Sequence, residues 1–108
     1  MTKLQRLLII PARGGSKRIK NKNIKEFKSK PIIFYTIDNA IKSKLFNKIH
    51  ISTDSNLIKK IVKKKNLQIE FMRSKKLSDD RTPLFKVYNF VVNEYRKRGF
   101  VFDEIWSI

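Results

Sequence analysis

The sequence contains no cysteine, little acidic charge and no long apolar run, and each shortage excludes a class of protein. Without cysteine, neither a disulfide framework nor a thiolate metal site can form. No apolar run reaches the roughly 18 residues that a transmembrane helix needs. The apolar stretch near the amino terminus is also too short for a signal peptide. These shortages lead us to expect a cytoplasmic protein that has no membrane as partner.

The scarcity of acidic residues leaves a large positive charge, with 26 Lys and Arg against 9 Asp and Glu, a net charge of +17. Such an excess indicates an anionic partner, and nucleic acid is the first candidate. Lysine far outnumbers arginine, however, and isoleucine and asparagine are also abundant, as an AT-rich genome produces at solvated positions. We therefore expect most of this charge to be solvated surface and nucleic acid not to be a partner. Non-specific nucleic-acid binding by a basic domain stays the alternative.

The order of apolar and amphipathic stretches predicts the fold class. The 108 residues suffice for one core, so we expect a single nucleotide-binding α/β domain over 1–108. Strand-like and helix-like periods alternate in the order β-α-β-α-β-α-β, which predicts a Rossmann-like parallel sheet with helices on its faces. The last strand is apolar and has nothing after it to cover Trp106, so we expect the domain to be incomplete at its carboxyl end. The expected strands are 4–10, 48–52, 67–72 and 104–108; the expected helices begin near Pro31, after Asp54 or Ser55, and near Phe85, and the last ends at Gly99.

The loop after the first expected strand combines glycine, hydroxyl and cationic residues. Ligands of parallel sheets bind at the carboxyl ends of the strands, which is where this loop begins. Paired glycines let a ligand approach the backbone, and successive amide groups can form an anion-binding concavity. Cations that converge on the same point suit the phosphates of a nucleotide, with a divalent metal supplying further charge. The residues that this hypothesis uses are Arg13, Gly14, Gly15, Ser16, Lys17 and Lys22.

Two better-known phosphate motifs are absent from this loop. A P-loop requires a glycine directly before Lys-Ser or Lys-Thr, and the sequence has none there. The dinucleotide fingerprint G-x-G-x-x-G fails because Ser16 occupies the position of its second glycine. A flexible basic loop is the alternative interpretation. The position of the loop directly after a buried strand favours a binding site.

The run Ile10-Pro-Ala-Arg-Gly-Gly-Ser-Lys-Arg-Ile, followed by Asn21-Lys-Asn-Ile-Lys25, resembles the signature of the acylneuraminate cytidylyltransferase family. The resemblance runs through about residue 83. The stretches Lys17-Arg18-Ile19 and Leu77-Ser-Asp-Asp80 lean toward its pseudaminic and legionaminic acid branches. Further stretches similar to the family are Lys30–Ile37, Leu45-Phe46, Ile51–Asp54, Phe71–Ser74 and Leu77–Asp80.

This resemblance implies an activity. Members of the family use CTP to convert a nine-carbon keto-sugar acid (sialic, pseudaminic or legionaminic acid) into the CMP-sugar, and they release pyrophosphate. They use Mg²⁺ or Mn²⁺, usually as homodimers. In the family the metal-binding aspartates and most of the sugar site lie beyond position 108. The resemblance therefore implies that this chain is the CTP-binding half, that it holds no metal ligands of its own and that it is inactive alone.

The resemblance also implies roles for individual residues. Arg13 and Lys22 would be catalytic, and Lys22 would stabilise the charge that develops at the α-phosphate. Backbone groups of Pro11 and Ala12 would meet the cytosine, and Arg73 would bind the base or the ribose. The full implied nucleotide site is Pro11, Ala12, Arg13, Gly14, Gly15, Ser16, Lys17, Lys22, Asn23, Arg73 and Thr82.

Alternatives stay open for the nucleotide and for several polar residues. A nucleotidyltransferase that uses UTP or GTP for another sugar would have the same fold. Asp54, Asp79 and Asp80 follow expected strands, but caps and turns are commoner tasks for aspartate than metal binding. His50, in mid-strand, is expected to face a helix or a partner rather than to catalyse. Trp106 is expected in the core.

Overall fold

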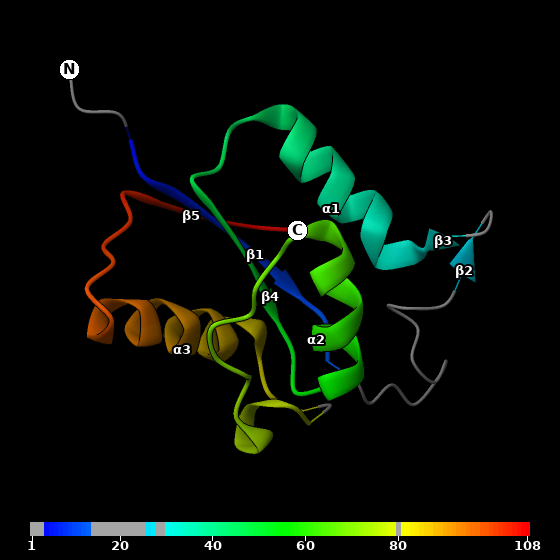
Figure 1. The fold of residues 1–108 in the computed structure, drawn as a ribbon. Helices are drawn as coiled ribbons and strands as arrows, with labels where there is room; N and C mark the ends of the chain where they lie inside the picture. The colour runs from blue at the N-terminus through cyan, green and yellow to red at the C-terminus, as the bar shows by residue number, and fades with distance from the viewer. Residues whose placement is uncertain (1–3, 14–25, 28–29, 80) are drawn as a thin grey trace.

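The computed structural model describes residues 4–13, 26–27, 30–79 and 81–108 (Figure 1). Strands and helices alternate over most of this range, as the sequence predicts. The elements are β1 (Arg6–Pro11), β2 (Glu26–Phe27), β3 (Lys30–Pro31), α1 (Ile32–Ser43), β4 (Lys48–Ser52), α2 (Asn56–Val62), the 3₁₀ turns η2 (Lys63–Lys65) and η3 (Lys75–Leu77), α3 (Leu84–Lys97) and β5 (Glu104–Ser107). None of the described helices has the length and apolar character needed to cross a membrane.

The main sheet has three parallel strands in the order β4-β1-β5. The first strand of the chain is therefore the central one, and Leu8 lies opposite Ile49 of β4 and Trp106 of β5. The run of apolar residues in β1 explains this place, because a central strand is covered on both faces and carries no polar side. The expected α/β class with a parallel sheet is confirmed.

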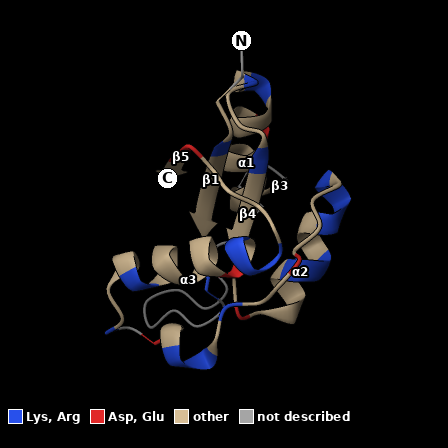
Figure 2. Ribbon diagram, turned by 90° about the vertical axis from the view of Figure 1, so that its left-hand side faces the viewer, with Lys and Arg blue, Asp and Glu red and all other residues tan. Residues whose placement is uncertain are grey.

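Helices cover both faces of this sheet, and Figure 2 shows α2 and α3 on opposite sides of it. Alternate residues of β1 point to opposite faces. Leu8 and Ile10 pack with buried residues of α1 and α2, such as Ile37 and Ile58. Leu7 and Ile9 pack with buried residues of α3 on the other face, namely Val91 and Tyr95. Each such side chain contributes about 1.5–3 kcal/mol when it is fully buried.

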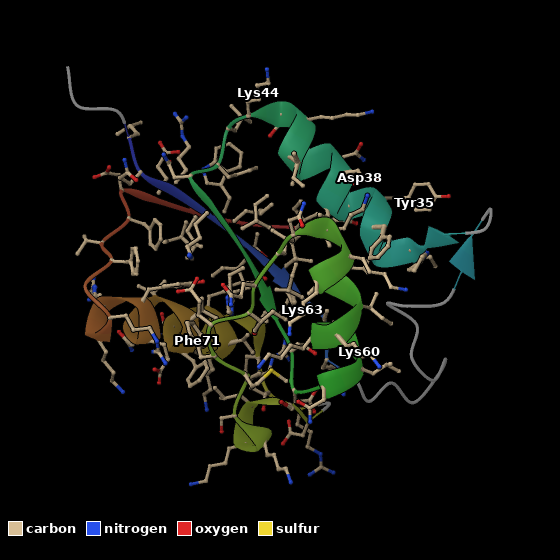
Figure 3. The ribbon with its side chains drawn as sticks, viewed as in Figure 1. Tyr35, Asp38, Lys44, Lys60, Lys63 and Phe71 are labelled. Atoms are coloured by element: carbon tan, nitrogen blue, oxygen red, sulfur yellow. The ribbon has the colours of Figure 1, made fainter. Side chains whose placement is uncertain are left out.

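A polar pair lies inside the α3-side core. His50 of β4 is buried, its Nδ1 is 2.9 Å from the hydroxyl of Tyr95, and its ring stacks on Phe71 at 4.5 Å between centroids. Figure 3 labels Phe71 beside α3. Burial, and then the charges of Lys48 and Arg73, lower the pKa of His50 from 6.5 to about 3. The expectation that His50 faces a helix is confirmed.

The expected third strand, 67–72, is wrong, because the structure assigns no strand to these residues. Alternate side chains of this segment nevertheless pack into the protein. Ile69 is buried in the α1–α2 core, and Phe71 packs against the α3-side core. Directly after this segment, the N–H of Arg73 donates to the carbonyl of Thr53, the residue that follows β4, at 2.7 Å. The alternation in the sequence thus predicts which side chains of 67–72 pack into the protein. It does not predict whether their backbone forms the hydrogen bonds of a strand.

Smaller differences from the expected elements occur near Pro31 and at Trp106. Between β1 and α1, the short strand β2 pairs antiparallel with β3. Pro31 ends β3, and α1 begins one residue later, at Ile32. Trp106 is 45% exposed rather than in the core, because β5 is an edge strand of the described sheet. Its ring lies edge-on to Phe46 at 5.6 Å.

The expected end of the last helix at Gly99 is confirmed by its geometry. Gly99 has φ +88°, in the left-handed region. Its N–H donates to Arg96 O at 3.0 Å, and the N–H of Phe100 donates to Tyr95 O at 2.9 Å. This pair of bonds is the Schellman motif, which satisfies carbonyl groups that the end of a helix leaves unpaired.

Replacing Gly99 with alanine is expected to lower the free energy of unfolding by about 1 kcal/mol, because a β-carbon disfavours the left-handed conformation. A steric clash does not contribute, since nothing lies within 4 Å of the added atom. Urea denaturation followed by circular dichroism measures the change. The control is Gly99→Asn, which tolerates this conformation better and should lose less. Equal stability of wild type and Gly99→Ala would contradict the assignment.

Stability is expected to fall as the pH drops below about 6.5, because the unfolded chain binds a proton at His50 that the folded protein excludes until about pH 3. Between pH 7 and pH 5 this single group accounts for about 2 kcal/mol. Denaturation of wild type and His50→Gln at both pH values isolates its share. The variant should show a clearly smaller loss. Equal losses in the two proteins would show that His50 is not the group responsible.

Candidate functional site

The carboxyl ends of β1 and β4 are joined by a hydrogen bond beyond their ladder. The N–H of Ala12, directly after β1, donates to the carbonyl of Ser52 at 2.8 Å. Ala12, Ser52 and Thr53 are all buried. This edge is where parallel sheets bind ligands, and the chain leaves it through Arg13 toward the glycine loop.

Arg73 lies beside this edge and is bonded to Ser52. It is only 6% exposed, and its guanidinium donates from Nε to Ser52 Oγ at 3.1 Å and from Nη2 to Ser52 O at 3.0 Å. Its backbone N–H donates to Thr53 O at 2.7 Å. A planar guanidinium offers donors at fixed angles, so it can hold a hydroxyl and a carbonyl of one residue at once.

Charges of both signs lie around Arg73. Burial is the main cause that lowers the pKa of Arg73, and the charge of Arg13 lowers it further. The nearby Asp54 and Tyr88 act in the opposite direction. The two arginine charges therefore act on each other across the edge. The charge of Asp54 has a larger effect on the pKa of Arg73 than the charge of Arg13, so this edge holds a carboxylate as well as two arginines.

The described site residues divide into a group that converges and one that stands apart. Pro11 ends β1 half-buried, Ala12 and Arg13 follow it, and Arg73 is bonded to Ser52 at the end of the neighbouring β4. Thr82 lies in the segment before α3, where its hydroxyl donates to Asp79 Oδ1 at 2.7 Å. No hydrogen bond of the described residues joins Thr82 to the other four. The predictions for Gly14, Gly15, Ser16, Lys17, Lys22 and Asn23 fall outside the described residues.

The described aspartates serve turns and local charge. Asp79 accepts hydrogen bonds from the backbone N–H groups of Arg81 and Thr82, which is the turn role expected of it. These bonds and that of the Thr82 hydroxyl lower the pKa of Asp79. Asp54 is not the cap of α2, because Ser55 accepts from the N–H of Ile58 at 3.2 Å. Asp80 lies outside the described residues.

A divalent metal does not fit the residues that the structure describes. Within 4–13, 26–27, 30–79 and 81–108, no group of three or more His, Asp or Glu side chains is placed to hold one. That the metal ligands lie beyond residue 108 stays a prediction. We therefore derive no chemical step through a metal ion.

Sequence reasoning missed Ser52 and Thr53, which form the floor of this edge. Both are polar yet fully buried, with side chains bonded to Arg73 and to the N–H of Ser55 respectively. The available signal was the run Ile51-Ser-Thr-Asp54, in which polar residues follow an apolar strand without a break. Buried polar residues at the carboxyl end of a strand need partners, and those partners define the site.

Comparisons with known proteins agree on the family. The profile of the family described as cytidylyltransferase matches residues 7–100. The pseudaminic acid cytidylyltransferase of Campylobacter jejuni is 37% identical over 102 residues, which cover 94% of this chain and 44% of the relative. The CMP-N,N'-diacetyllegionaminic acid synthase of the same species is 46% identical over 76 residues, which cover 70% of this chain and 32% of the relative.

Solved structures support the fold independently. The structure of CMP:2-keto-3-deoxy-manno-octonic acid synthetase complexed with CTP is similar to this chain with a TM-score of 0.74 and 19% identity. The match covers 95% of this chain and 39% of that one. The chain thus spans less than half the length of these relatives. The profile match over most of the sequence shows that this chain belongs to the cytidylyltransferase family, and the parallel sheet agrees with it.

Proposed function

We propose that this chain carries the CTP-binding part of an enzyme that joins cytidylate to a nine-carbon keto-sugar acid. Sialic, pseudaminic and legionaminic acids are the candidate sugars. The observation that carries the proposal is that Ala12 and Arg13 lead directly from the carboxyl end of β1 into the family's glycine loop. Ala12 is fixed there by its hydrogen bond to Ser52, and Arg13 adds a cation beside Arg73.

Cytosine would be recognised by the backbone that follows β1. The N–H of Ala12 is already bonded to Ser52, so we infer that its carbonyl meets the base instead. A carbonyl accepts a hydrogen bond from the exocyclic amine of cytosine. Uracil has an oxygen acceptor at that position and would leave the carbonyl without a partner, which gives a physical reason for CTP over UTP.

The triphosphate would be held by the loop that begins at Arg13. Arg13 and Lys22 are proposed as the residues that oppose its charge, with Ser16, Lys17 and the glycine amides around it. Arginine binds phosphate oxygens in pairs, which fixes orientation as well as charge. Asn23 and Thr82 are proposed to contribute at the sugar or base. Mg²⁺ or Mn²⁺ is proposed as the ion that accompanies CTP.

The proposed reaction is a displacement at the α-phosphorus of CTP. The anomeric oxygen of the sugar forms a bond to that phosphorus, the bond to the bridging oxygen breaks, pyrophosphate leaves, and the hydroxyl proton passes to solvent. Residues of this chain would position CTP and stabilise charge in the transition state. The sugar site, a homodimeric state and a cytoplasmic location are proposed for the whole enzyme.

The net charge of +17 favours one other candidate, non-specific binding of nucleic acid. Such binding relies on many cations gathered on one surface. Among the residues that the structure describes, Figure 2 shows basic positions on α1, α2 and α3 rather than on one of them alone. This distribution fits solvated surface charge and favours the nucleotide proposal.

Arg13→Ala and Lys22→Ala are each expected to remove most of the thermal stabilisation that CTP confers, with a loss of about 10- to 100-fold in affinity, because each deletes charge-assisted bonds to phosphate. Differential scanning fluorimetry and calorimetric titration with CTP measure both effects. The matched control is Lys64→Ala, which removes an exposed lysine from η2 and should leave CTP binding unchanged.

Two outcomes would contradict the CTP site. Equal thermal shifts with CTP, UTP, GTP and ATP would indicate a nucleotide site without the proposed base recognition. Unchanged binding in Arg13→Ala, combined with affinity for any polyanion that falls steeply with salt, would indicate the nucleic-acid alternative instead.

The 108-residue chain is expected to bind CTP without turning it over. Incubated with CTP, Mg²⁺ and each of the three candidate sugar acids, it should release pyrophosphate at the background rate. A coupled phosphate assay with added pyrophosphatase measures this release. Release clearly above that of a heat-denatured control would show that the chain holds a complete catalytic site.

A further inference from the structure

The strand β5 lies at an edge of the main sheet. It pairs with β1, and the described strands place nothing on its other side. Figure 2 shows it outside β1, on the side away from β4. The N–H and C=O groups on the outer edge of such a strand can pair with a strand of another chain.

Side chains do little to protect this edge. Proteins commonly block an exposed edge strand with lysine or proline, and Glu104–Ser107 contains neither. Its one charged residue, Glu104, is occupied, because its Oε1 accepts from Arg6 Nε at 2.9 Å and from Trp106 Nε1 at 2.9 Å. Ile105 is 41% exposed, and Trp106 beside it is exposed to a similar extent. The strand thus combines open backbone groups with apolar side chains.

The distribution of charge also favours contact at this place. Two copies of a protein with a net charge of +17 repel each other over most of their surfaces. Residues 99–108 contain no lysine or arginine, and their two charged residues are acidic. A second copy can therefore approach this segment with weaker repulsion and bury apolar surface there. The exposed large apolar side chains of the segment are Phe100, Val101, Ile105, Trp106 and Ile108.

The opposite edge of the sheet is flanked by another part of the chain. Beside β4, Phe71 stacks on His50 with ring centroids 4.5 Å apart, and Glu70 forms an ion pair with Lys48. The segment 67–72 therefore lies alongside β4, although it forms no strand. Association through sheet edges would use β5 alone and would close at two copies.

We propose that β5 is a self-association surface, through which two copies of this chain pair their β5 strands antiparallel about a twofold axis. The joined sheet would have the strand order β4-β1-β5-β5-β1-β4, with α3 of both copies on one face. Antiparallel pairing directs the two carboxyl edges away from each other. The edge of β5 takes no part in the proposed CTP site, so the pairing does not depend on the proposed function.

Sedimentation equilibrium of the 108-residue chain between about 5 and 500 µM measures this association, which a short strand pair should make weak and concentration-dependent. The expected result is an equilibrium of monomer and dimer with no larger species. Trp106, the one tryptophan of the chain, reports on the same surface. Its fluorescence emission should shift to shorter wavelength as the dimer forms, because pairing shields its exposed ring from water.

Ile105→Lys should weaken the dimer at least about 10-fold, because it places a lysine on the edge in each copy. Ile108→Lys should weaken it less. That side chain is 67% exposed, so its replacement is expected to leave the fold intact, and this variant decides the question if Ile105→Lys does not fold. Circular dichroism checks the fold of each variant.

The matched control is Leu57→Lys on α2. Leu57 is 46% exposed, close to the exposure of Ile105, and the substitution adds the same charge away from β5. It should leave the dissociation constant of the dimer within about 2-fold of that of wild type.

Salt distinguishes an apolar contact from one made of ion pairs. Raising NaCl from about 0.05 M to about 0.5 M screens the repulsion between the two chains, so the dimer should become at least about 3-fold tighter. An interface held by ion pairs would weaken instead.

Each contrary result overturns the inference. A wild-type chain that stays monomeric at the highest concentration has no such surface. A dimer that Ile105→Lys and Ile108→Lys leave unchanged, or that weakens with salt, uses another part of the molecule. Growth beyond two copies would show that the association does not close, and that a second surface takes part.

Discussion

The placement of β1 between two parallel partners is the constraint on which the rest of the structure depends. Its residues 7–10 are apolar on both sides, so helices must cover both faces of the sheet. α1 and α2 cover one face, and α3 covers the other. Because β1 is central, Ala12 leaves it from the middle of the carboxyl edge, where the carbonyl of Ser52 accepts from both Ala12 and Arg73.

Two basic side chains, Arg73 and His50, are buried near the end of β4, and only Arg73 carries a charge at neutral pH. Arg73 is buried at the end of β4, and His50 is buried two residues before that end. The charges of Arg73 and Lys48 both lower the pKa of His50, after the larger effect of burial. The imidazole is therefore neutral at physiological pH and adds no third positive charge to this face. A neutral ring can instead share a proton with the hydroxyl of Tyr95 and stack on Phe71.

Patterns in the sequence were sufficient to predict the α/β class, the bounds of β4 and the helix end at Gly99. Each of these depends on the residue types within one short segment. Such patterns failed at 67–72, where the alternation is satisfied by packing without a strand ladder. They failed at Trp106 because exposure depends on which strand lies at an edge, and sequence does not show the order of strands. Resemblance supplied the candidate site, but only coordinates could show that Arg73 is bonded to Ser52.

The strand order β4-β1-β5 has a consequence for synthesis on the ribosome. β1 is made long before its partner β5, and the bond from Gln5 N to Asp103 Oδ2 spans 98 positions. At typical translation rates the interval is on the order of 5–20 seconds. Throughout it, one edge of the most apolar strand stays open to pairing with foreign strands. Shielding of this edge until β5 has been made would therefore protect the nascent chain from aggregation.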